Sequence, residues 1–447
     1  MIGADALFAG IARACARNGL GEPADLKRLT GGATMESWRF VCGQDAYVLR
    51  RAPSAEFMAD RPYGHDVEAE VIRKAFAAGV TAPEVVAELT PEDAIGSGFV
   101  MRSLPGTPNP KEILEMQDAS GLLRQAAGDL ARIHGIARDA LPDVIPVMDY
   151  REAIADFRAQ FTEAGGDRPI IALGIKWLEE NCPEACEPVL NHGDYRLGNL
   201  LAEDSKLTGV LDWELAHFGD PHEDLAFGCM AVWRFARYDR PALGLGSLEA
   251  YFAAYEAAGG AKVDPKRFRY WLVHRTVWWA LGCLKMAKFW RSGEDRMLER
   301  VVISRRTSEQ ELDLLMLLEE DAPDKERHRK ATGGSFESFG YGEADSAELA
   351  DAILEWLETI KHRMEGHDRF QHAVARNALG IIARDWRIWP HPYRASGMVS
   401  DILDGKSGLK ERYFLQSLKG NALEKVSVDS PKYPALAVAR KKWTGET

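Results

Sequence analysis

The chain has 447 residues, 46% of them hydrophobic, and carries a formal net charge of −12. This composition is ordinary for a soluble globular protein of two or three domains. Residues 331–447 contain equal numbers of acidic and basic residues, so the whole negative charge falls in residues 1–330 and argues against a nucleic-acid partner, which would favour a basic surface.

The cysteines and the apolar segments indicate a cytoplasmic protein that does not span a membrane. Six cysteines without an obvious pairing suit a reducing compartment, and Cys182 and Cys186 lack the second pair that a zinc site would need. The N-terminal segment has no long apolar run followed by a cleavage site, so we expect no secretion. Residues 270–290 are rich in aromatic side chains, but charged side chains interrupt them, which favours a buried helix over a membrane span.

The first elements expected in chain order form a small sheet with a glycine turn. Residues 37–41 and 47–50 predict two paired strands, and residues 29–34 (LTGGAT) predict a turn before them. Gly31 and Gly32 would let the backbone close over phosphate groups, because no Cβ stands in the way. A glycine hairpin turn without any ligand explains the same residues, and both interpretations stay open.

A helix and a further strand complete this N-terminal part. Residues 66–77 carry an apolar stripe at helical spacing. Residues 99–104 predict a strand that runs into a turn at Pro105 and Gly106.

The motif with the clearest chemical meaning is HGDYRLGN at residues 192–199, followed by VLDWE at residues 210–214. Short apolar segments precede and follow the first motif, so we expect it on a loop between strands. Asp194 and Asp212 would then lie at the ends of adjacent strands.

These residue types suit phosphoryl transfer from ATP. The reaction needs an Asp that accepts or orients the attacking hydroxyl, and an Asn and a second Asp that hold Mg²⁺. The spacing from Asp194 to Asn199 equals that of the protein-kinase catalytic loop, with Gly193 in place of its Arg. The alternative is a hairpin that His192 and Asp194 tie together without catalysis, and the position of Asp212 in register speaks against it.

The C-terminal part reads as a linker and a small helical domain. Residues 308–320 predict a helix, and the polar, glycine-rich residues after it predict an exposed linker. Beyond the linker we expect helices at 346–364, 369–386 and 409–418, and an extended tail at 426–433. His362, His367 and His372 recur every five residues, which does not keep them on one helical face, so we expect no metal site there.

Together these motifs resemble the aminoglycoside-phosphotransferase-like kinases, relatives of the protein kinases, over roughly residues 20–320. The segment FGDPHEDLA at residues 218–226 matches the one that follows the metal-binding Asp in this family, where Asp224 braces the catalytic loop. The resemblance implies an α+β, protein-kinase-like two-lobed fold. Its parts would be a β-rich N-lobe at 1–104, a mostly helical C-lobe at 105–320, a linker at 321–345 and an all-α domain of unknown function at 346–447.

The resemblance also assigns residues to ATP. Gly31 and Gly32 match the phosphate-covering loop, and Arg50 stands where the family usually has Lys. Arg is planar and forked, so this exchange is not conservative, although Arg can still bind phosphate. The partner of Arg50 is expected on the helix at 66–77, with Glu70 as the best match and Glu68 as the alternative.

Residues 99–104 resemble the hinge between the two lobes of a kinase. Met101 would line the pocket behind adenine, and the backbone groups of Arg102 and Leu104 would face the base. Ordinary core packing is the alternative for Met101. The hinge residues do not decide between ATP and GTP.

The catalytic residues follow from the same resemblance. Asp194 matches the catalytic Asp, and Asn199 and Asp212 match the two ligands of Mg²⁺. Arg196 lies where hydroxyl-directed kinases commonly carry a Lys on the transferred phosphate, where a cation would neutralise developing charge. A surface Arg without a function is the alternative.

The substrate is expected to be a small molecule with a hydroxyl group. Residues 269–287 resemble the branch of the family associated with acyl-CoA dehydrogenases, for which the implied substrates are hydroxyacyl-CoA thioesters. Many of these aromatic residues also fit the central helix of a C-lobe. An aminoglycoside or amino-alcohol kinase of the choline or homoserine type remains an alternative, as does a nucleotide-binding pseudokinase. The oligomeric state stays open.

Overall fold

The computed structural model describes residues 3–29, 35–52, 58, 61–292, 294, 298–331, 346–388 and 396–445. It divides into two compact units. Unit 1 comprises residues 1–149, 184–229 and 233–268, and unit 2 comprises residues 150–183, 230–232 and 269–447.

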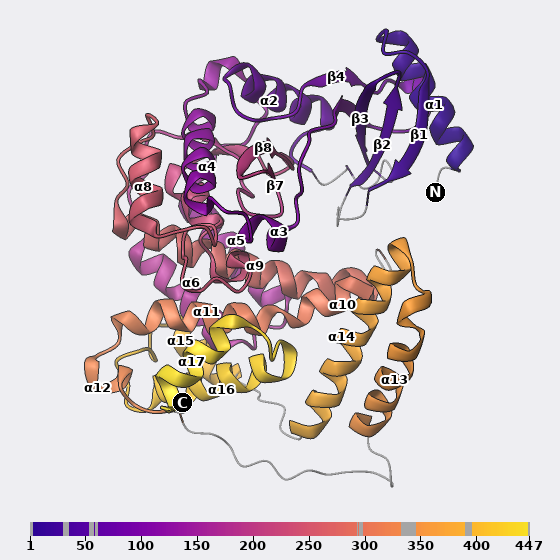
Figure 1. The fold of residues 1–447 in the computed structure, drawn as a ribbon. Coiled ribbons are helices and arrows are strands. Elements are labelled where there is room, and N and C mark those ends of the chain that lie inside the picture. The colour runs from indigo at the N-terminus through magenta and orange to yellow at the C-terminus, as the bar shows by residue number, and fades with distance from the viewer. Residues whose placement is uncertain are drawn as a thin grey trace. The chain divides into compact units, whose positions relative to one another are not determined.

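The N-terminal part of unit 1 is a five-stranded antiparallel sheet with the strand order β1-β2-β3-β5-β4 (Figure 1). The two predicted strands at 37–41 and 47–50 are confirmed as β2 and β3. The elements of this part are α1 (Ala4–Arg17), β1 (Pro23–Arg28), β2 (Glu36–Cys42), β3 (Asp45–Arg51), α2 (His65–Ala77), β4 (Val85–Glu88), the 3₁₀ helix η2 (Pro91–Asp93) and β5 (Gly98–Arg102).

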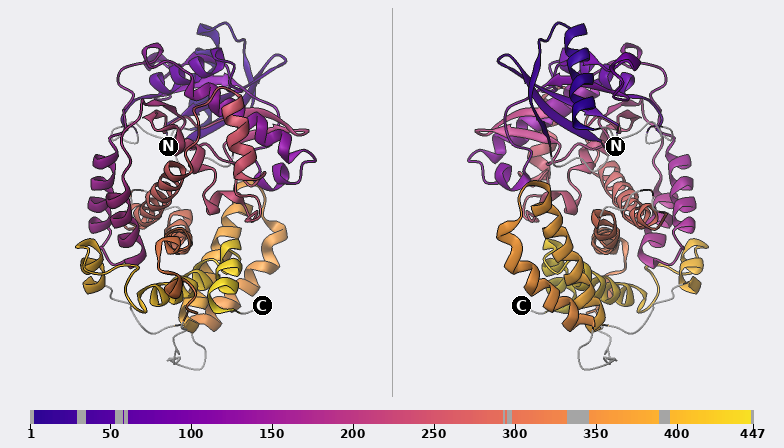
Figure 2. Two further views of the ribbon diagram at one scale, coloured as in Figure 1. Left: turned by 90° about the vertical axis from the view of Figure 1, so that its left-hand side faces the viewer. Right: turned by 90° about the vertical axis from the view of Figure 1, so that its right-hand side faces the viewer.

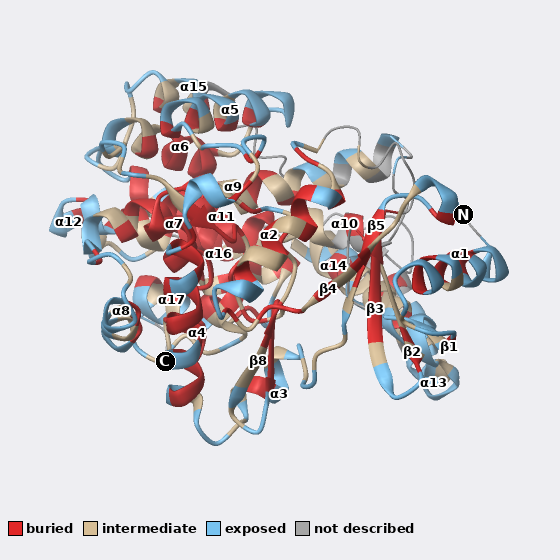
Figure 3. Cartoon of the chain, turned by 90° about the horizontal axis from the view of Figure 1, so that it is seen from above, coloured by how far each residue is buried: buried red, intermediate tan, exposed pale blue. Residues whose placement is uncertain are grey.

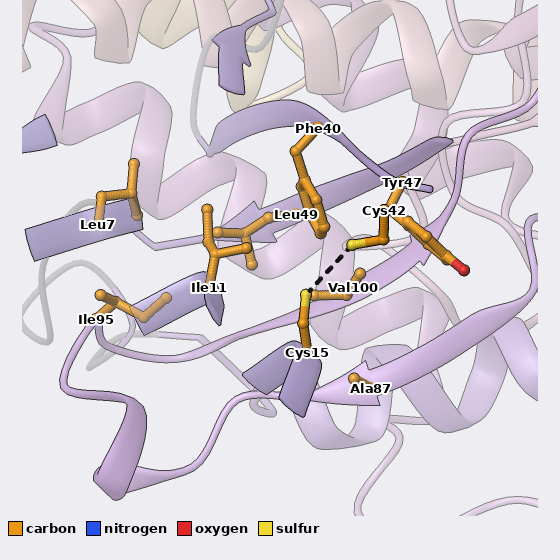
Figure 4. Packing of buried hydrophobic residues seen from close by; sticks show 10 residues of the cluster. All are labelled: Leu7, Ile11, Cys15, Phe40, Cys42, Tyr47, Leu49, Ala87, Ile95 and Val100. Atoms are coloured by element: carbon orange, nitrogen blue, oxygen red, sulfur yellow. Dashed lines mark hydrogen bonds between the residues drawn. The ribbon is translucent and has the colours of Figure 1, made fainter. Parts of the chain in front are cut away.

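Side chains alternate across the sheet, so its two faces have different roles. On one face, α1 packs with the strands around a buried cluster (Figure 4), because every second residue of a strand points the same way. Leu49 belongs to this cluster, whereas its neighbour Arg50 reaches Glu68 of α2 on the other face. Seen from above, β3 and β5 are the buried strands (Figure 3). The cluster consists of Leu7, Ile11, Cys15, Phe40, Cys42, Tyr47, Leu49, Ala87, Ile95 and Val100.

The rest of unit 1 carries two small two-stranded sheets between helices. Strand β6 pairs with β9, and β7 pairs with β8, both antiparallel. The prediction that Asp194 and Asp212 end adjacent strands is therefore wrong, because β9 and not β8 lies beside β6. These elements are α3 (Pro110–Leu114), α4 (Ala119–His134), η3 (Arg138–Ala140), β6 (Val189–Asn191), β7 (Leu200–Glu203), β8 (Lys206–Val210), β9 (His217–Gly219), α7 (Pro221–Phe227) and α8 (Leu248–Ala257).

Several of these helices begin at residues that satisfy their first free N–H groups. Asp220 precedes α7 and accepts a hydrogen bond from His222 N at 3.0 Å, with Pro221 in the first helical position. Asp118 caps α4 in the same way through Gly121 N at 2.7 Å.

Unit 2 is helical. Its helices α13 and α14 pack side by side as a hairpin (Figure 2). The elements are α5 (Tyr150–Glu163), α6 (Pro169–Asn181), η4 (Ala231–Arg234), α9 (Pro265–Ser292), α10 (Leu298–Arg305), α11 (Thr307–Leu318), η5 (Glu319–Asp321), α12 (Asp324–Arg327), α13 (Ser346–Ile360), η6 (Lys361–Arg363), α14 (Gly366–Ile388), α15 (Ser396–Leu403), α16 (Phe414–Asp429) and α17 (Pro434–Thr444), of which η4 and α9 begin or end in unit 1.

The end of the chain differs from the sequence prediction. The predicted helix at 409–418 begins later and continues to Asp429, so residues 426–429 of the predicted extended tail are helical, and a further helix follows from Pro434. The reason is burial at helical spacing: Leu415, Leu418, Ala422 and Val426 all face the interior.

The C-terminal helices pack within unit 2 and do not form a compact body of their own. Helices α16 and α17 lie against α11, α14 lies against α10, and α15 lies against α6. Residues 332–345 of the predicted linker lie outside the described residues. The predicted buried helix at 270–290 is part of α9, and none of the described helices has the length and apolar character needed to span a membrane.

Candidate active site

The loop after β6 carries Asp194 and depends on a glycine. Gly193 has φ +83°, in the left-handed region that favours glycine. A Cβ atom at this position would lie 2.3 Å from the carbonyl oxygen of Leu215. The backbone therefore has no room here for the Arg of the protein-kinase loop.

Asp224, in the first turn of α7, binds the backbone of this loop. Its carboxylate accepts hydrogen bonds from the backbone N–H groups of His192 at 2.5 Å and Gly193 at 2.8 Å. Burial by itself would raise the pKa of Asp224, but the contact with His134 and these N–H groups outweigh it and keep the pKa below its usual value. The predicted bracing role of Asp224 is confirmed.

The Asp194 carboxylate is largely buried, with 14% of its side chain exposed, and receives donors from its own loop. Arg196 Nε donates to Oδ1 at 2.7 Å and Arg196 Nη2 to Oδ2 at 3.2 Å. Asn199 Nδ2 donates to Oδ2 at 2.6 Å. The pKa of Asp194 is raised to about 6, chiefly by burial and to a smaller extent by Asp212, while Arg196 and Asn199 oppose the rise. The carboxylate is thus ionised at neutral pH and basic enough to take a proton.

Asn199 and Asp212 are brought together because they flank one hairpin: Asn199 precedes β7, and Asp212 follows β8. The Leu211 N–H donates to the Asn199 carbonyl oxygen at 2.8 Å, which fixes the residue before Asp212 beside the catalytic loop. Asp212 has φ +69°, an uncommon conformation for a residue other than glycine.

The donor atoms of these two residues suit Mg²⁺. Asn199 uses its Nδ2 on Asp194, which leaves its amide oxygen as the acceptor atom, and Asp212 has a carboxylate that is a third exposed. Mg²⁺ is usually held by one or two such protein oxygens together with substrate phosphates and water. Among the described residues no cluster of three or more His, Cys, Asp or Glu side chains is arranged to hold a metal by itself.

Arg50 on β3 binds three carboxylates. Its Nε lies 2.9 Å from Glu68, and its Nη2 lies 2.7 Å from both Asp212 and Glu214. Arg61 also reaches Glu214, at 3.1 Å. This cluster links β3, α2 and the segment after β8.

The partner of Arg50 is therefore Glu68, and the preference for Glu70 is wrong. Two residues apart on a helix, these side chains point about 200° apart. Glu68 is on the buried side of α2, whereas Glu70 is a third exposed and pairs with Arg73 and Lys74.

The acidic and basic groups of this cluster shift one another's pKa values. Burial raises the pKa of Glu68 to about 7, against the opposing effect of Arg50. Burial alone would lower the pKa of Arg50, but the three carboxylates outweigh it and raise the pKa above its usual value. Arg50 is a permanent cation placed next to the candidate metal ligand Asp212.

The hinge residues lie at the end of β5. Met101 is half-buried and pairs in register with Val48. The backbone N–H of Arg102 donates to the Glu84 carbonyl oxygen at 2.9 Å, so it is not available to a base. Its side chain is exposed and pairs with Glu84 at 2.6 Å. Gly31 and Gly32 lie outside the described residues.

Comparison with known proteins identifies the family. The APH family, described as the phosphotransferase enzyme family, matches residues 25–265, more than half of the chain. The chain belongs to this family. It is a phosphotransferase with a protein-kinase-like fold, and the predicted fold class and family are confirmed.

Three relatives show the range of this family. Over 265 residues the chain is 29% identical to acyl-CoA dehydrogenase family member 10 of Mus musculus, a match that covers 52% of this chain and 24% of that protein. Hygromycin-B 4-O-kinase of Escherichia coli is 26% identical over 219 residues, 45% of this chain and 61% of the kinase. A crystal structure from Ralstonia eutropha, of a candidate aminoglycoside phosphotransferase, is 18% identical with a TM-score of 0.56, covering 70% of this chain and 98% of that one.

The chain therefore spans about a quarter of the length of the mouse acyl-CoA dehydrogenase relative. Residues 25–265, which match the family, include Arg50, Asp194, Asn199 and Asp212. Sequence analysis missed Glu214, Arg61 and Trp233, which complete the surroundings of Arg50 and Arg196. Glu214 lies two residues after Asp212, and this spacing of two acidic residues after a strand was a usable signal.

Proposed function

We propose that this phosphotransferase moves the γ-phosphoryl group of ATP to the hydroxyl group of a hydroxyacyl-CoA. The observation that carries the proposal is the partly exposed Asp194 carboxylate, held by Arg196 and Asn199 within the loop that contacts the residue before Asp212. Such a carboxylate can orient an alcohol and accept its proton.

Each residue of the site would have a separate role in the reaction. Asp194 takes the proton of the acceptor hydroxyl while the new O–P bond forms and the bond to the β-phosphate oxygen of ATP breaks, releasing ADP. Arg196 neutralises charge on the transferred group. Asn199 and Asp212 would hold Mg²⁺, which would offset the negative charge of the phosphates.

The nucleotide is assigned to the N-terminal sheet. Arg50, fixed by Glu68, would pair with phosphate oxygens. Met101, the carbonyl group of Arg102 and the backbone of Leu104 would face the base.

The acyl-CoA assignment rests on the matched relatives. The mouse protein matched over residues of this segment is named as an acyl-CoA dehydrogenase family member, and several further relatives carry the same kind of name. Phosphorylating a hydroxyl converts a poor leaving group into a good one, a useful step before elimination from an acyl chain. The six cysteines form no disulfide within the described residues, which fits a reducing cytoplasm as the location.

A second candidate is an aminoglycoside kinase, which the match to hygromycin-B 4-O-kinase favours. The position of Arg196 beside Asp194 argues against an aminoglycoside acceptor, because the guanidinium group would repel a cationic acceptor close to Asp194.

The acceptor can be determined by following ADP release with Mg²⁺-ATP. The panel would contain 3- and 4-hydroxyacyl-CoAs, the matching free hydroxy acids, aminoglycosides, choline and homoserine. We expect turnover with the CoA thioesters alone. Turnover with an aminoglycoside or amino alcohol would overturn the acyl-CoA assignment, and ATP binding without turnover on any acceptor would support a pseudokinase.

A further inference from the structure

We propose that Trp233 is a positioning residue for phosphoryl transfer: its indole ring holds the guanidinium group of Arg196 flat, with its edge on Asp194. This inference rests on the proposed function, because it assigns Trp233 a role in phosphoryl transfer. Trp233 would act through Arg196 and not by touching ATP or the acceptor. It concerns unit 1 alone, which contains all the residues involved.

The first observation is the stacking of Arg196 on Trp233. The central carbon of the guanidinium group lies 4.1 Å from the centroid of the indole ring. This is a short cation–π contact, and Trp is the aromatic side chain that binds cations best. The same guanidinium group makes two hydrogen bonds to Asp194 through its edge. One face and one edge of the planar group are thus fixed by two different residues.

The second observation is that Trp233 is itself held in place. It is buried, and its ring stacks on Phe227 with centroids 6.4 Å apart and an angle of 13° between the planes. The next residue, Arg234, anchors the segment by donating to the Cys229 carbonyl oxygen from Nε at 2.9 Å and from Nη2 at 2.6 Å. The ring therefore forms a rigid support.

The third observation is the close approach of Gly198 to the guanidinium group of Arg196. Gly198 has φ +102°, and a Cβ atom there would lie 2.7 Å from Arg196 Nη1. The same nitrogen donates to the Leu197 carbonyl oxygen at 3.2 Å. A side chain at position 198 would therefore crowd the guanidinium group, which the glycine leaves in contact with the loop backbone.

These contacts have a consequence for the reaction. A free arginine side chain samples many rotamers, and holding it in one orientation before the reaction lowers the barrier, since no reorganisation is needed as charge develops. The guanidinium group stays beside the carboxylate that receives the acceptor hydroxyl. Trp233 would act on the rate through Arg196 and would contribute little to nucleotide affinity.

The alternative is that Trp233 is only part of the hydrophobic core. A core residue would affect folding stability, and its effect on catalysis would not depend on Arg196. The two roles can be separated with a double-mutant cycle.

The experiment measures kcat and KM for ATP in the full-length chain with its best acceptor. We expect Trp233→Leu to lower kcat about tenfold with little change in the KM for ATP, and Trp233→Phe to recover most of the loss, because it keeps an aromatic face. In the cycle, Arg196→Leu and Arg196→Leu/Trp233→Leu should have the same kcat. If Trp233→Leu does not fold, Trp233→Met replaces it as the variant without an aromatic ring.

A matched control is available in unit 2, where Arg269 stacks on the ring of Trp177 at 5.1 Å. Trp177→Leu removes a similar contact and should leave kcat unchanged. A Trp233→Leu enzyme with wild-type kcat would overturn the proposal, as would losses that multiply in full in the double variant. A wild-type chain inactive on every acceptor would overturn the proposed function and this inference together.

Discussion

The two charged clusters of unit 1 differ in how far apart their members lie in the chain. Asp194 is held by residues two and five positions away, within a single loop. Arg50 binds Asp212 and Glu214, 162 and 164 positions away. Both clusters combine carboxylates with arginine, but only the first is a local structure.

The difference shows which side chains can be exchanged. In the Asp194 loop no other residue can replace the carboxylate that accepts the proton, so loss of Asp194 alone should nearly stop the reaction. The Arg50 cluster contains three carboxylates and two arginines, so removing one carboxylate leaves other partners for the arginine. Loss of Asp194 should therefore be far more damaging than loss of Glu68.

Asp194→Asn should have the largest effect. It keeps the shape of the side chain but removes the proton acceptor, and we expect kcat to fall about 10³-fold. ATP binding, measured by calorimetry, should stay close to that of the wild type. A variant that retains turnover would show that another group is the base.

Asp212→Asn should have the next largest effect, through the handling of Mg²⁺-ATP. The substitution removes the charge of a candidate metal ligand, and we expect kcat/KM for ATP to fall about 10²-fold, with partial recovery at high Mg²⁺ concentration. Measuring activity across a Mg²⁺ titration tests this. The assignment of Asp212 to the metal would be wrong if the Mg²⁺ dependence of the variant matched that of the wild type.

Glu68→Gln and Glu70→Gln form a matched pair on one helix. Glu68→Gln weakens the hold on Arg50, and we expect the KM for ATP to rise about tenfold above pH 7, where Glu68 would otherwise be ionised. Glu70→Gln removes only exposed ion pairs and should change neither KM nor stability measurably. Equal effects of the two substitutions would contradict the pairing of Arg50 with Glu68.

The pH dependence should show the smallest effect. Asp194 must be ionised to take a proton and its pKa is about 6, so kcat should fall as the pH is lowered through about 6. Arg196 lowers this pKa, so in Arg196→Leu the acid limb of the pH profile should move to higher pH. A limb that moves to lower pH or stays in place would contradict the contact between these two residues.

The same difference in chain distance explains what could be predicted from the sequence. The loop at 192–199 was predicted correctly because its spacing reflects local geometry, and so was the bracing residue Asp224. The choice between Glu68 and Glu70 depended on the rotation of α2 against the sheet, which tertiary packing sets and a helical pattern alone leaves open. Trp233 escaped notice because nothing in its local sequence links it to Arg196, 37 positions earlier.

The fold shows the same limit. The strands β2 and β3 and the helix α2 follow from alternation and helical spacing within short segments. The pairing of β6 with β9 is a long-range choice that the sequence does not state. At the C-terminus, the first residues of the tail predicted to be extended at 426–433 belong to α16, because packing against α11 keeps residues 426–429 helical.

The most direct test of the central claim is transfer of label from ATP carrying a radioactive γ-phosphate to a 4-hydroxyacyl-CoA. Wild-type chain and Asp194→Asn would be compared under single-turnover conditions, with the CoA thioester separated before counting. We predict that label enters the thioester with the wild type, in step with ADP formation, and that the variant transfers almost none while still binding ATP. Label in the thioester at equal rates with both proteins, or label only in inorganic phosphate, would contradict the account.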